Sequence, residues 1–385
     1  MHPSRGERTV RGGEERDVRP RVAYLRPWQT LSDYEMGYVM LLGEEFDLDV
    51  ITVGEPALGG ISYPVRKCVW PDTVTLGGRE RSLLNAFYSR VLKRRYHIPG
   101  LEPLLRKAEI VQGGEAASEH SYQAARLKER YGFRLLLSAS ENLPLLESRS
   151  PRERDRILFT LSKVDHAFCI SRLAADRLVE AGFDESAVSL LGHGIDCERF
   201  SLSGRKATSG LLRVGYCGRF TPEKGLPVLI EAARSLPVKL VFQGAGPLEQ
   251  DLKRAAPQAQ FLPPRPYREN HLFYKTIDLF VLPSIEYPGL TEQFGFVLIE
   301  AMASGLPIVA SRVGGIPEVV DDAAVLVPPN DPETLRAEIA RLANDRAERE
   351  RLGRKGRERA LRLFRREFVA ERMRKVYRKL LSERK

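Results

Sequence analysis

Residues 278–320 read DLFVLPSIEYPGLTEQFGFVLIEAMASGLPIVASRVGGIPEVV and carry the strongest structural signals in the chain. The apolar start predicts a buried strand, Leu279–Leu282, and a loop rich in Pro and Gly follows it. A helix is expected through about Ala303, where Gly305-Leu306-Pro307 stops it and a second strand, Ile308–Ala310, begins. This order of strand, helix and strand is typical of parallel sheets covered by helices.

The turn that opens this helix predicts a binding site for a phosphate group. Backbone N–H groups of Phe294–Val297 lie at the helix start, which attracts anions, and Gly295 lets a ligand approach closely. Glu292 and Glu300 can accept hydrogen bonds from paired sugar hydroxyls, although two such Glu residues are most often simply solvated. Because apolar residues surround Glu300, its carboxylate needs a partner.

A second segment, VGYCGRFTPEKG at 214–225, places two cations after a predicted strand. The strand ends in Gly218, Arg219 follows directly, and Lys224 comes five residues later. A loop after such a strand faces the ligand-binding edge of the sheet. A planar guanidinium and a compact ammonium together suit a diphosphate, and two ordinary surface cations are the alternative.

A third segment, QGAGP at 243–247, is weak evidence for any cofactor. It lacks the third glycine and the acidic partner of a dinucleotide-binding fingerprint. A nicotinamide-dependent oxidoreductase is therefore disfavoured.

The alternation of strands and helices extends over nearly the whole chain. At about 100–200 residues per domain, 385 residues suit two domains. A charged tail is expected at 1–20, followed by halves at 21–205 and 206–363 that the polar stretch 201–210 connects. Further strands are expected at Val22–Leu25, Asp49–Val53, Ile110–Val111, Arg134–Leu137, Ala167–Ile170, Leu212–Cys217 and Leu240–Gln243.

Composition disfavours several classes of protein. The chain is 43% hydrophobic and 29% charged, which indicates packed cores rather than disorder. Its four cysteines form no Cys-x-x-Cys pair, so a zinc site or disulfide scaffold is not expected. No apolar run approaches the roughly 20 residues of a membrane-spanning helix, and the start lacks the apolar core of a signal peptide. A cytoplasmic protein is expected.

The net charge of +10 comes from the C-terminal end. Residues 351–385 hold 15 Lys and Arg against four Glu, so the rest of the chain is nearly neutral. Apolar residues recur at helical spacing from Phe364 to Leu380 and predict an amphipathic helix with a basic face. Docking of this helix on the protein is one alternative, and peripheral contact with an inner membrane face or an acidic acceptor is the other.

Taken together, the motifs of the C-terminal half resemble the retaining glycosyltransferases of family four, over about residues 163–327. The matching strings are GYCGRFTPEKGLPVLIEAA, QGAGPLEQDL, VLPS, EQFGFVLIEAMASGLPIVAS and GGIPEVV. The resemblance implies the GT-B architecture, in which two doubly wound Rossmann-like α/β domains face a cleft. It implies transfer of a sugar, with retention, from a nucleotide-diphosphate sugar to a hydroxyl of a glycan, glycolipid or small molecule. A non-catalytic binder of sugar nucleotides or anionic surfaces is the alternative.

The resemblance also implies roles for individual residues. Arg219 and Lys224 would hold the donor diphosphate, and Glu300 would bind the ribose hydroxyls. Glu292, with the backbone of Phe294–Phe296, would position the donor sugar.

Other implied roles concern the rim of the site and the end of the chain. Gly218 and the Gly314-Gly315 loop would approach the ligand closely, and Arg265 would lie near the base. The last helix, at 364–385, would cross back and complete the N-terminal domain.

The N-terminal half departs from the family pattern. The first loop, at 27–33, has no glycine, and no His follows the predicted strand Arg134–Leu137. Glu141 or Asn142 would take the place of that His, and a branch of the family carries such a Glu-Asn pair. His193, at the domain junction, is expected to be structural rather than catalytic.

No metal or organic cofactor is expected. Asp47-Leu48-Asp49 has the Asp-x-Asp form of metal-dependent transferases of another fold, but it precedes a predicted strand, where charged residues are ordinary. Arg219 and Lys224 can neutralise a diphosphate without a metal. The expected partners are a nucleotide-sugar donor and a sugar, lipid-linked or small-molecule acceptor, and no nucleic acid.

Overall fold

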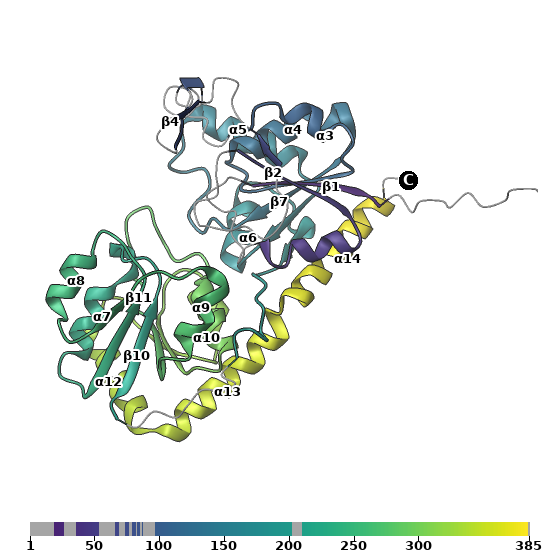
Figure 1. Cartoon of the computed structure of the whole chain (residues 1–385). Helices are drawn as coiled ribbons and strands as arrows, with labels where there is room; N and C mark the ends of the chain where they lie inside the picture. The colour runs from purple at the N-terminus through teal and green to yellow at the C-terminus, as the bar shows by residue number, and fades with distance from the viewer. Residues whose placement is uncertain are drawn as a thin grey trace, which may run out of the picture.

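The computed structural model describes residues 19–26, 36–53, 66–68, 74–76, 79–81, 83–84, 87, 97–201 and 210–383. The expected tail up to residue 18, the loop at 27–33 and most of the linker, 202–209, lie outside these ranges. The described residues form two α/β domains, and helices from the C-terminal end run along both (Figure 1). The prediction of two doubly wound α/β domains is confirmed.

Each domain is built on a parallel sheet, with strand order β3-β2-β1-β6-β7-β8-β9 in the N-terminal domain and β12-β11-β10-β13-β14-β15 in the C-terminal domain. The order reverses next to β1 and next to β10, and in such sheets ligands bind outside the carboxyl ends at this point. The strands are β1 (Arg21–Leu25), β2 (Asp47–Val53), β3 (Arg66–Cys68), β6 (Ile110–Gly113), β7 (Arg134–Ala139), β8 (His166–Cys169), β9 (Val188–Leu190), β10 (Leu212–Cys217), β11 (Val238–Gln243), β12 (Gln260–Leu262), β13 (Leu279–Leu282), β14 (Ile308–Ser311) and β15 (Val325–Val327), with a separate antiparallel pair, β4 (Val74–Leu76) and β5 (Arg79–Arg81).

Helices connect these strands. No described helix combines the length and the apolar character that crossing a membrane requires. The α-helices are α3 (Leu101–Leu105), α4 (Glu119–Tyr131), α5 (Pro151–Lys163), α6 (Arg172–Glu180), α7 (Leu226–Ala233), α8 (Glu249–Ala255), α9 (Tyr267–Tyr274), α10 (Phe296–Ala303), α11 (Ile316–Val320), α12 (Pro332–Asn344), α13 (Arg346–Leu363) and α14 (Arg366–Ser382), and the 3-10 helices are η2 (Met40–Glu44), η3 (Glu185–Ala187) and η4 (Pro222–Lys224).

The prediction that the Asp-x-Asp sequence precedes a strand is wrong. Strand β2 begins at Asp47, so Asp47 and Asp49 lie within the sheet. The Asp49 carboxylate accepts hydrogen bonds from Arg21 at 3.3 Å and from Arg66 at 3.1 Å. This carboxylate is therefore part of an ion-pair network between β1, β2 and β3.

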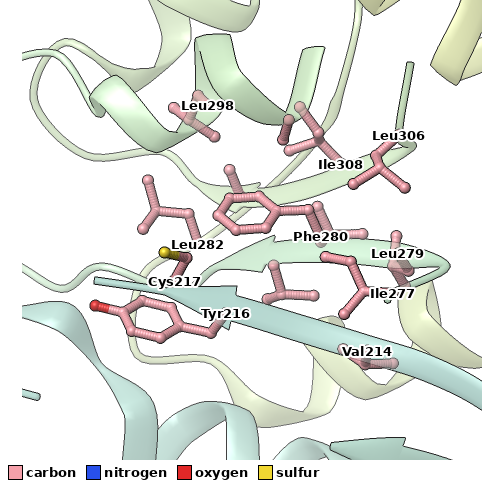
Figure 2. Close-up of a cluster of buried hydrophobic side chains, with 14 of the residues drawn as sticks. Val214, Tyr216, Cys217, Ile277, Leu279, Phe280, Leu282, Leu298, Leu306 and Ile308 are labelled. Carbon is pink, nitrogen blue, oxygen red and sulfur yellow. The ribbon is translucent and has the colours of Figure 1, made fainter. Parts of the chain in front are cut away.

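The core of the C-terminal domain fixes the segment that decides the fold. Figure 2 shows side chains of β10, β13, β14 and α10 packed in one cluster, with Phe280 and Leu298 among them. Helix α10 ends as predicted, because Gly305 adopts a φ of 65° and its N–H donates to the Met302 carbonyl. The Leu306 N–H donates to the Ala301 carbonyl, which completes a Schellman motif and aims the chain into β14.

Helix α14 packs on the N-terminal domain. Its buried Met373 and Tyr377 belong to the same cluster as Val22 of β1 and Phe168 of β8. The helices α13 and α14 follow one another along the side of both domains (Figure 1).

Part of the basic face of α14 is used inside the protein. Arg374 pairs with Glu44 at 2.5 Å, and Arg378 pairs with Glu45 at 2.6 Å. These two cations bind the N-terminal domain. Of the two alternatives given for the helix, this is docking on the protein.

Replacing Tyr377 by Phe is expected to lower the free energy of unfolding by about 1–3 kcal/mol. The Tyr377 hydroxyl donates to Gln112 Oε1, and both residues are fully buried, so the substitution leaves a buried acceptor unpaired. Chemical unfolding of the two proteins measures the difference. Tyr131→Phe is the matched control: its hydroxyl bonds the half-exposed Glu102, where water can replace it, and an equal loss in both variants would contradict the argument.

Candidate active site

Loops at the carboxyl edge of the six-stranded sheet meet next to its switch point. The loop after β10 and the loop after β13 are in contact, because a Cβ atom on Gly225 would lie 2.0 Å from the Pro283 carbonyl oxygen. The Ile285 N–H also donates to the Glu223 carbonyl at 3.0 Å. The predicted cation loop and the predicted carboxylate loop therefore form one surface.

The structure brings Lys224 and Glu292 together. Lys224 Nζ donates to Glu292 Oε2 over 2.6 Å, and the Ser284 hydroxyl donates to the same oxygen over 3.0 Å. Both charged side chains are mostly buried, with 16% and 11% of their surface exposed. An ammonium has three N–H donors and Glu292 takes one, so Lys224 can also donate to a ligand oxygen.

Arg219 lies at the rim of this surface. Its side chain is 72% exposed, and its guanidinium donates to Glu223 Oε1 over 3.1 Å. Gly218 precedes it, and a Cβ atom there would lie 2.7 Å from the Tyr216 hydroxyl, so the position is sterically reserved for glycine.

The Gly314-Gly315 loop lies against the carboxylate loop. The Gly315 N–H donates to the Glu292 carbonyl over 2.9 Å. Cβ atoms on Gly314 and Gly315 would lie 2.0 Å from the Glu292 carbonyl oxygen and 2.2 Å from that of Gln293. The structure therefore places these glycines against the protein backbone, which fixes the course of residues 292 and 293.

Glu300 is buried, and its carboxylate accepts hydrogen bonds from two side chains. Asn270 Nδ2 donates to Glu300 Oε2 over 2.8 Å, and the Tyr274 hydroxyl donates to the same oxygen. Burial raises the pKa of Glu300 to about 7, and these two hydrogen bonds oppose that rise. Both bonds end on Oε2, which leaves Oε1 as the oxygen able to accept from a ligand.

The partners of Glu300 were not found from the sequence. Asn270 and Tyr274 are four residues apart and so lie on one face of α9. This spacing, visible in the sequence, could have indicated that the two side chains contact the same partner. Asn270 Oδ1 in turn accepts from Gln243 Nε2 over 2.6 Å, at the end of β11. A buried polar chain thus connects two helices to the edge of the sheet.

The start of α10 has the expected geometry. Gly295 adopts a φ of 75°, which favours glycine, and the helix begins at Phe296. Phe294 is buried against Phe364, with ring centroids 5.8 Å apart, so the turn is held by packing. Arg265 is exposed in the segment between β12 and α9 and pairs with Glu269 at 3.8 Å.

On the N-terminal side, Glu141 and Asn142 follow β7 and differ in role. Glu141 is partly exposed and accepts from the Leu143 N–H over 3.1 Å. Asn142 is buried and its amide donates to the carbonyl oxygens of Glu292 and Gln293 in the other domain, at 3.2 and 3.0 Å. The carboxyl edges of the two sheets therefore meet at this residue.

Sequence reasoning missed a second carboxylate on this side. Glu115 accepts from the Ser140 N–H over 2.7 Å and from its hydroxyl over 2.5 Å. Burial raises the pKa of Glu115, which these bonds oppose.

His193 lies among aromatic rings at the domain junction. Its ring centroid is 5.1 Å from that of Phe294 and 5.6 Å from that of Phe296. Burial lowers its pKa to about 3, with a contribution from the charge of Arg26. The imidazole is therefore neutral near pH 7, and a structural rather than catalytic role for His193 stays a prediction. Among the residues that the structure describes, no group of three or more His, Cys, Asp or Glu could hold a metal ion.

Sequence comparison connects this chain to transferases. Residues 206–359 match the profile of the family described as glycosyl transferases group 1. The chain is 30% identical over 255 residues to a D-inositol 3-phosphate glycosyltransferase of Saccharomonospora viridis, which covers 56% of this chain and 58% of the relative. It is 33% identical over 193 residues to the amylovoran biosynthesis glycosyltransferase AmsK of Erwinia amylovora, covering 46% and 47%. The chain thus spans about half the length of these curated relatives.

Structural comparison covers nearly the whole chain. A sucrose-phosphate synthase from Thermosynechococcus elongatus aligns with a TM-score of 0.73 and 21% identity, over 95% of this chain and all of the other. Anabaena HepE in complex with UDP and glucose aligns with a TM-score of 0.72 and 16% identity, over 94% and all of the other. These likenesses show the GT-B fold. Residues 206–359, in the C-terminal domain, thus match the glycosyl transferases group 1 family, and the whole chain has the GT-B fold.

Proposed function

We propose that the chain transfers a sugar, with retention of the anomeric configuration, from a nucleoside-diphosphate sugar to a hydroxyl of a sugar, glycolipid or small molecule. The observation that carries the proposal is the contact of Lys224 with Glu292 beside the start of α10. Cation, carboxylate and helix N-terminus meet there on the edge where parallel sheets bind ligands. UDP-glucose, which a HepE structure contains, is the first donor to consider, and UDP, found in another HepE structure, is the first nucleotide to test.

The proposed mechanism is electrostatic. Lys224, Arg219 and the N–H groups at the start of α10 stabilise the negative charge that grows on the departing diphosphate. The acceptor oxygen forms its bond to the anomeric carbon as the bond to the phosphate oxygen breaks. The leaving phosphate takes the acceptor proton, so the proposal needs no metal and no organic cofactor.

The remaining residues bind and orient. Glu300 accepts from the ribose hydroxyls through Oε1, and Arg265 lies toward the base. Glu292 positions the donor sugar. Glu141 faces the acceptor side in this proposal, because it follows a strand of the N-terminal sheet at the same edge as Asn142.

Thermal unfolding with a panel of nucleotides tests the proposal. One nucleoside diphosphate among UDP, GDP, ADP and TDP is expected to raise the Tm in the absence of magnesium, by mass action on the folded state. The sugar conjugates of that nucleotide are then tested to identify the donor. Turnover is measured as the release of free nucleotide. A shift only with NAD would contradict the proposal, and a shift without transfer or slow donor hydrolysis would favour a sugar-nucleotide binder.

A further inference from the structure

One side chain of the N-terminal domain holds the backbone of the donor loop, here defined as Glu292–Gly295. Asn142 Nδ2 donates to two successive carbonyl oxygens of this loop, Glu292 at 3.2 Å and Gln293 at 3.0 Å. The residues are 150 positions apart in the chain, and Asn142 is 3% exposed. A buried amide with both N–H groups on one partner segment is a specific contact.

The orientation of this amide follows from its surroundings. The Ser171 hydroxyl accepts from the Ala174 N–H at the start of α6, and its own proton goes to Asn142 Oδ1 at 3.1 Å. The oxygen of the amide is thereby assigned to Ser171, and the nitrogen must face the two carbonyls, which only accept. Arg177 Nε also donates to the Asn142 carbonyl at 3.2 Å, so α6 fixes both its backbone and its side chain.

The donor loop is held from two sides by different domains. On the C-terminal side, the Gly315 N–H donates to the Glu292 carbonyl at 2.9 Å. On the other side the only described side chain that donates to the Glu292 and Gln293 carbonyls is that of Asn142. A second contact crosses nearby, where the Arg172 N–H donates to Glu318 Oε2 over 2.6 Å. The first turn of α6 therefore meets the C-terminal domain at this point.

We propose that Asn142 is a positioning residue that couples the approach of the two domains to the conformation of the donor loop. When the domains meet, its amide fixes residues 292 and 293, and with them the Glu292 carboxylate and the start of α10. When they separate, the loop loses this support. The inference rests on the proposed function, because the loop is taken to bind the donor sugar. Closure of two domains around a ligand completes the catalytic site of many enzymes.

Substitution by Asp is the sharpest test, because Asp keeps the shape of Asn142 but faces two carbonyl oxygens with a carboxylate oxygen. Ala merely removes the donors. The kcat for release of UDP from UDP-glucose is expected to fall about tenfold in Asn142→Ala and about a hundredfold in Asn142→Asp. The Kd for UDP is expected to stay within about twofold in both, because the nucleotide contacts lie in the C-terminal domain.

The two hydrogen bonds from the Asn142 amide to the donor loop are here called the clamp. Hydrogen exchange measures its effect on the loop without any ligand. Amides in peptides that cover 290–298 and 312–316 are expected to exchange several-fold faster in both variants than in wild type, and α12 is expected to be unchanged. Asn344→Asp is the matched control, since Asn344 is exposed at the end of α12 and makes the same change of charge. This control should alter neither turnover nor the exchange of the peptides that cover 290–298 and 312–316.

The outcomes separate the clamp from the proposed function. Unchanged exchange at 290–298 in Asn142→Asp would overturn the clamp, whatever the activity. Faster exchange with wild-type kcat would overturn its role in positioning. If wild-type protein releases no UDP from UDP-glucose, the exchange result still decides the clamp, and turnover of the donor identified by the nucleotide panel decides its role. A transfer failure with every donor would count against the proposed function alone.

Discussion

Lys224→Ala is expected to lower kcat by about 100- to 1,000-fold and to change the KM for the donor by less than about threefold. The negative charge on the leaving diphosphate is larger in the transition state than in the bound donor, so a cation that touches it acts mainly on kcat. Lys224 has the geometry for this role, because Glu292 holds its ammonium at the base of the donor loop. Steady-state kinetics with the preferred donor measures both constants.

The ion pair of Lys224 with Glu292 also contributes to stability, so a loss of kcat can come from loss of folded protein. Two further variants separate an effect on stability from an effect on the leaving group. Removing Lys224 leaves the Glu292 carboxylate with Ser284 as its remaining side-chain donor, which costs stability and lowers the Tm. Lys224→Arg keeps the charge at a different geometry and should recover part of kcat. Lys239→Ala, on an exposed position of β11, is the control for loss of a lysine. A kcat of Lys224→Ala within threefold of wild type would exclude the role in leaving-group stabilisation.

The fold of the C-terminal domain was predictable because its signals are local. Strand β13 matches its predicted limits, and the Gly305-Leu306 pair ends α10 through hydrogen bonds within six residues. The strands that were missed are three-residue edge or near-edge strands. Strands β9 and β12 are only partly buried and lack the continuous apolar run that identified the central strands, whereas β15 lies in an apolar run, AAVLV at 323–327, that could have identified it.

The site was predictable only where one segment contains it. Glu292, Gly295 and Glu300 lie within nine residues, and the predicted helix start, the apolar neighbours of Glu300 and the family resemblance together predicted a ligand site there. The partners that give them their chemistry come from distant elements: Lys224 is 68 positions from Glu292, and Asn142 is 150. Such contacts depend on which strands pair within a sheet and on how two domains meet, and no periodicity in one sequence encodes them.

Glu300→Gln is expected to raise the Kd for the preferred nucleoside diphosphate by about 10- to 100-fold, the value of charge-assisted hydrogen bonds to two hydroxyls. The 2′-deoxy form of the nucleotide tests the contact directly. Wild type should bind it more weakly than the ribose form, and the variant should bind both forms nearly alike. Titration calorimetry with the four combinations gives a coupling between Glu300 and the 2′-hydroxyl.

The pH dependence provides a second signature of the same carboxylate. Because burial raises its pKa to about 7 in the free protein, Glu300 is protonated at pH 6 and ionised at pH 8. Ribose hydroxyls donate to the ionised form, so the affinity ratio of wild type to Glu300→Gln should rise with pH over this interval; taking the ratio cancels the titration of the phosphates.

Stability responds to pH in the opposite sense. The folded pKa of Glu300 is raised above the unfolded value of 4.5, so its contribution to stability is complete below about pH 4.5 and is lost as the pH rises through about 7. The Gln variant should therefore not be less stable than wild type at pH 8, and weaker binding there reports the lost contact rather than unfolding. Equal affinities of wild type and variant at pH 8 for both the ribose and the 2′-deoxy nucleotide would place the ribose elsewhere, and the buried chain from Gln243 through Asn270 to Glu300 would then be a structural network of the domain core.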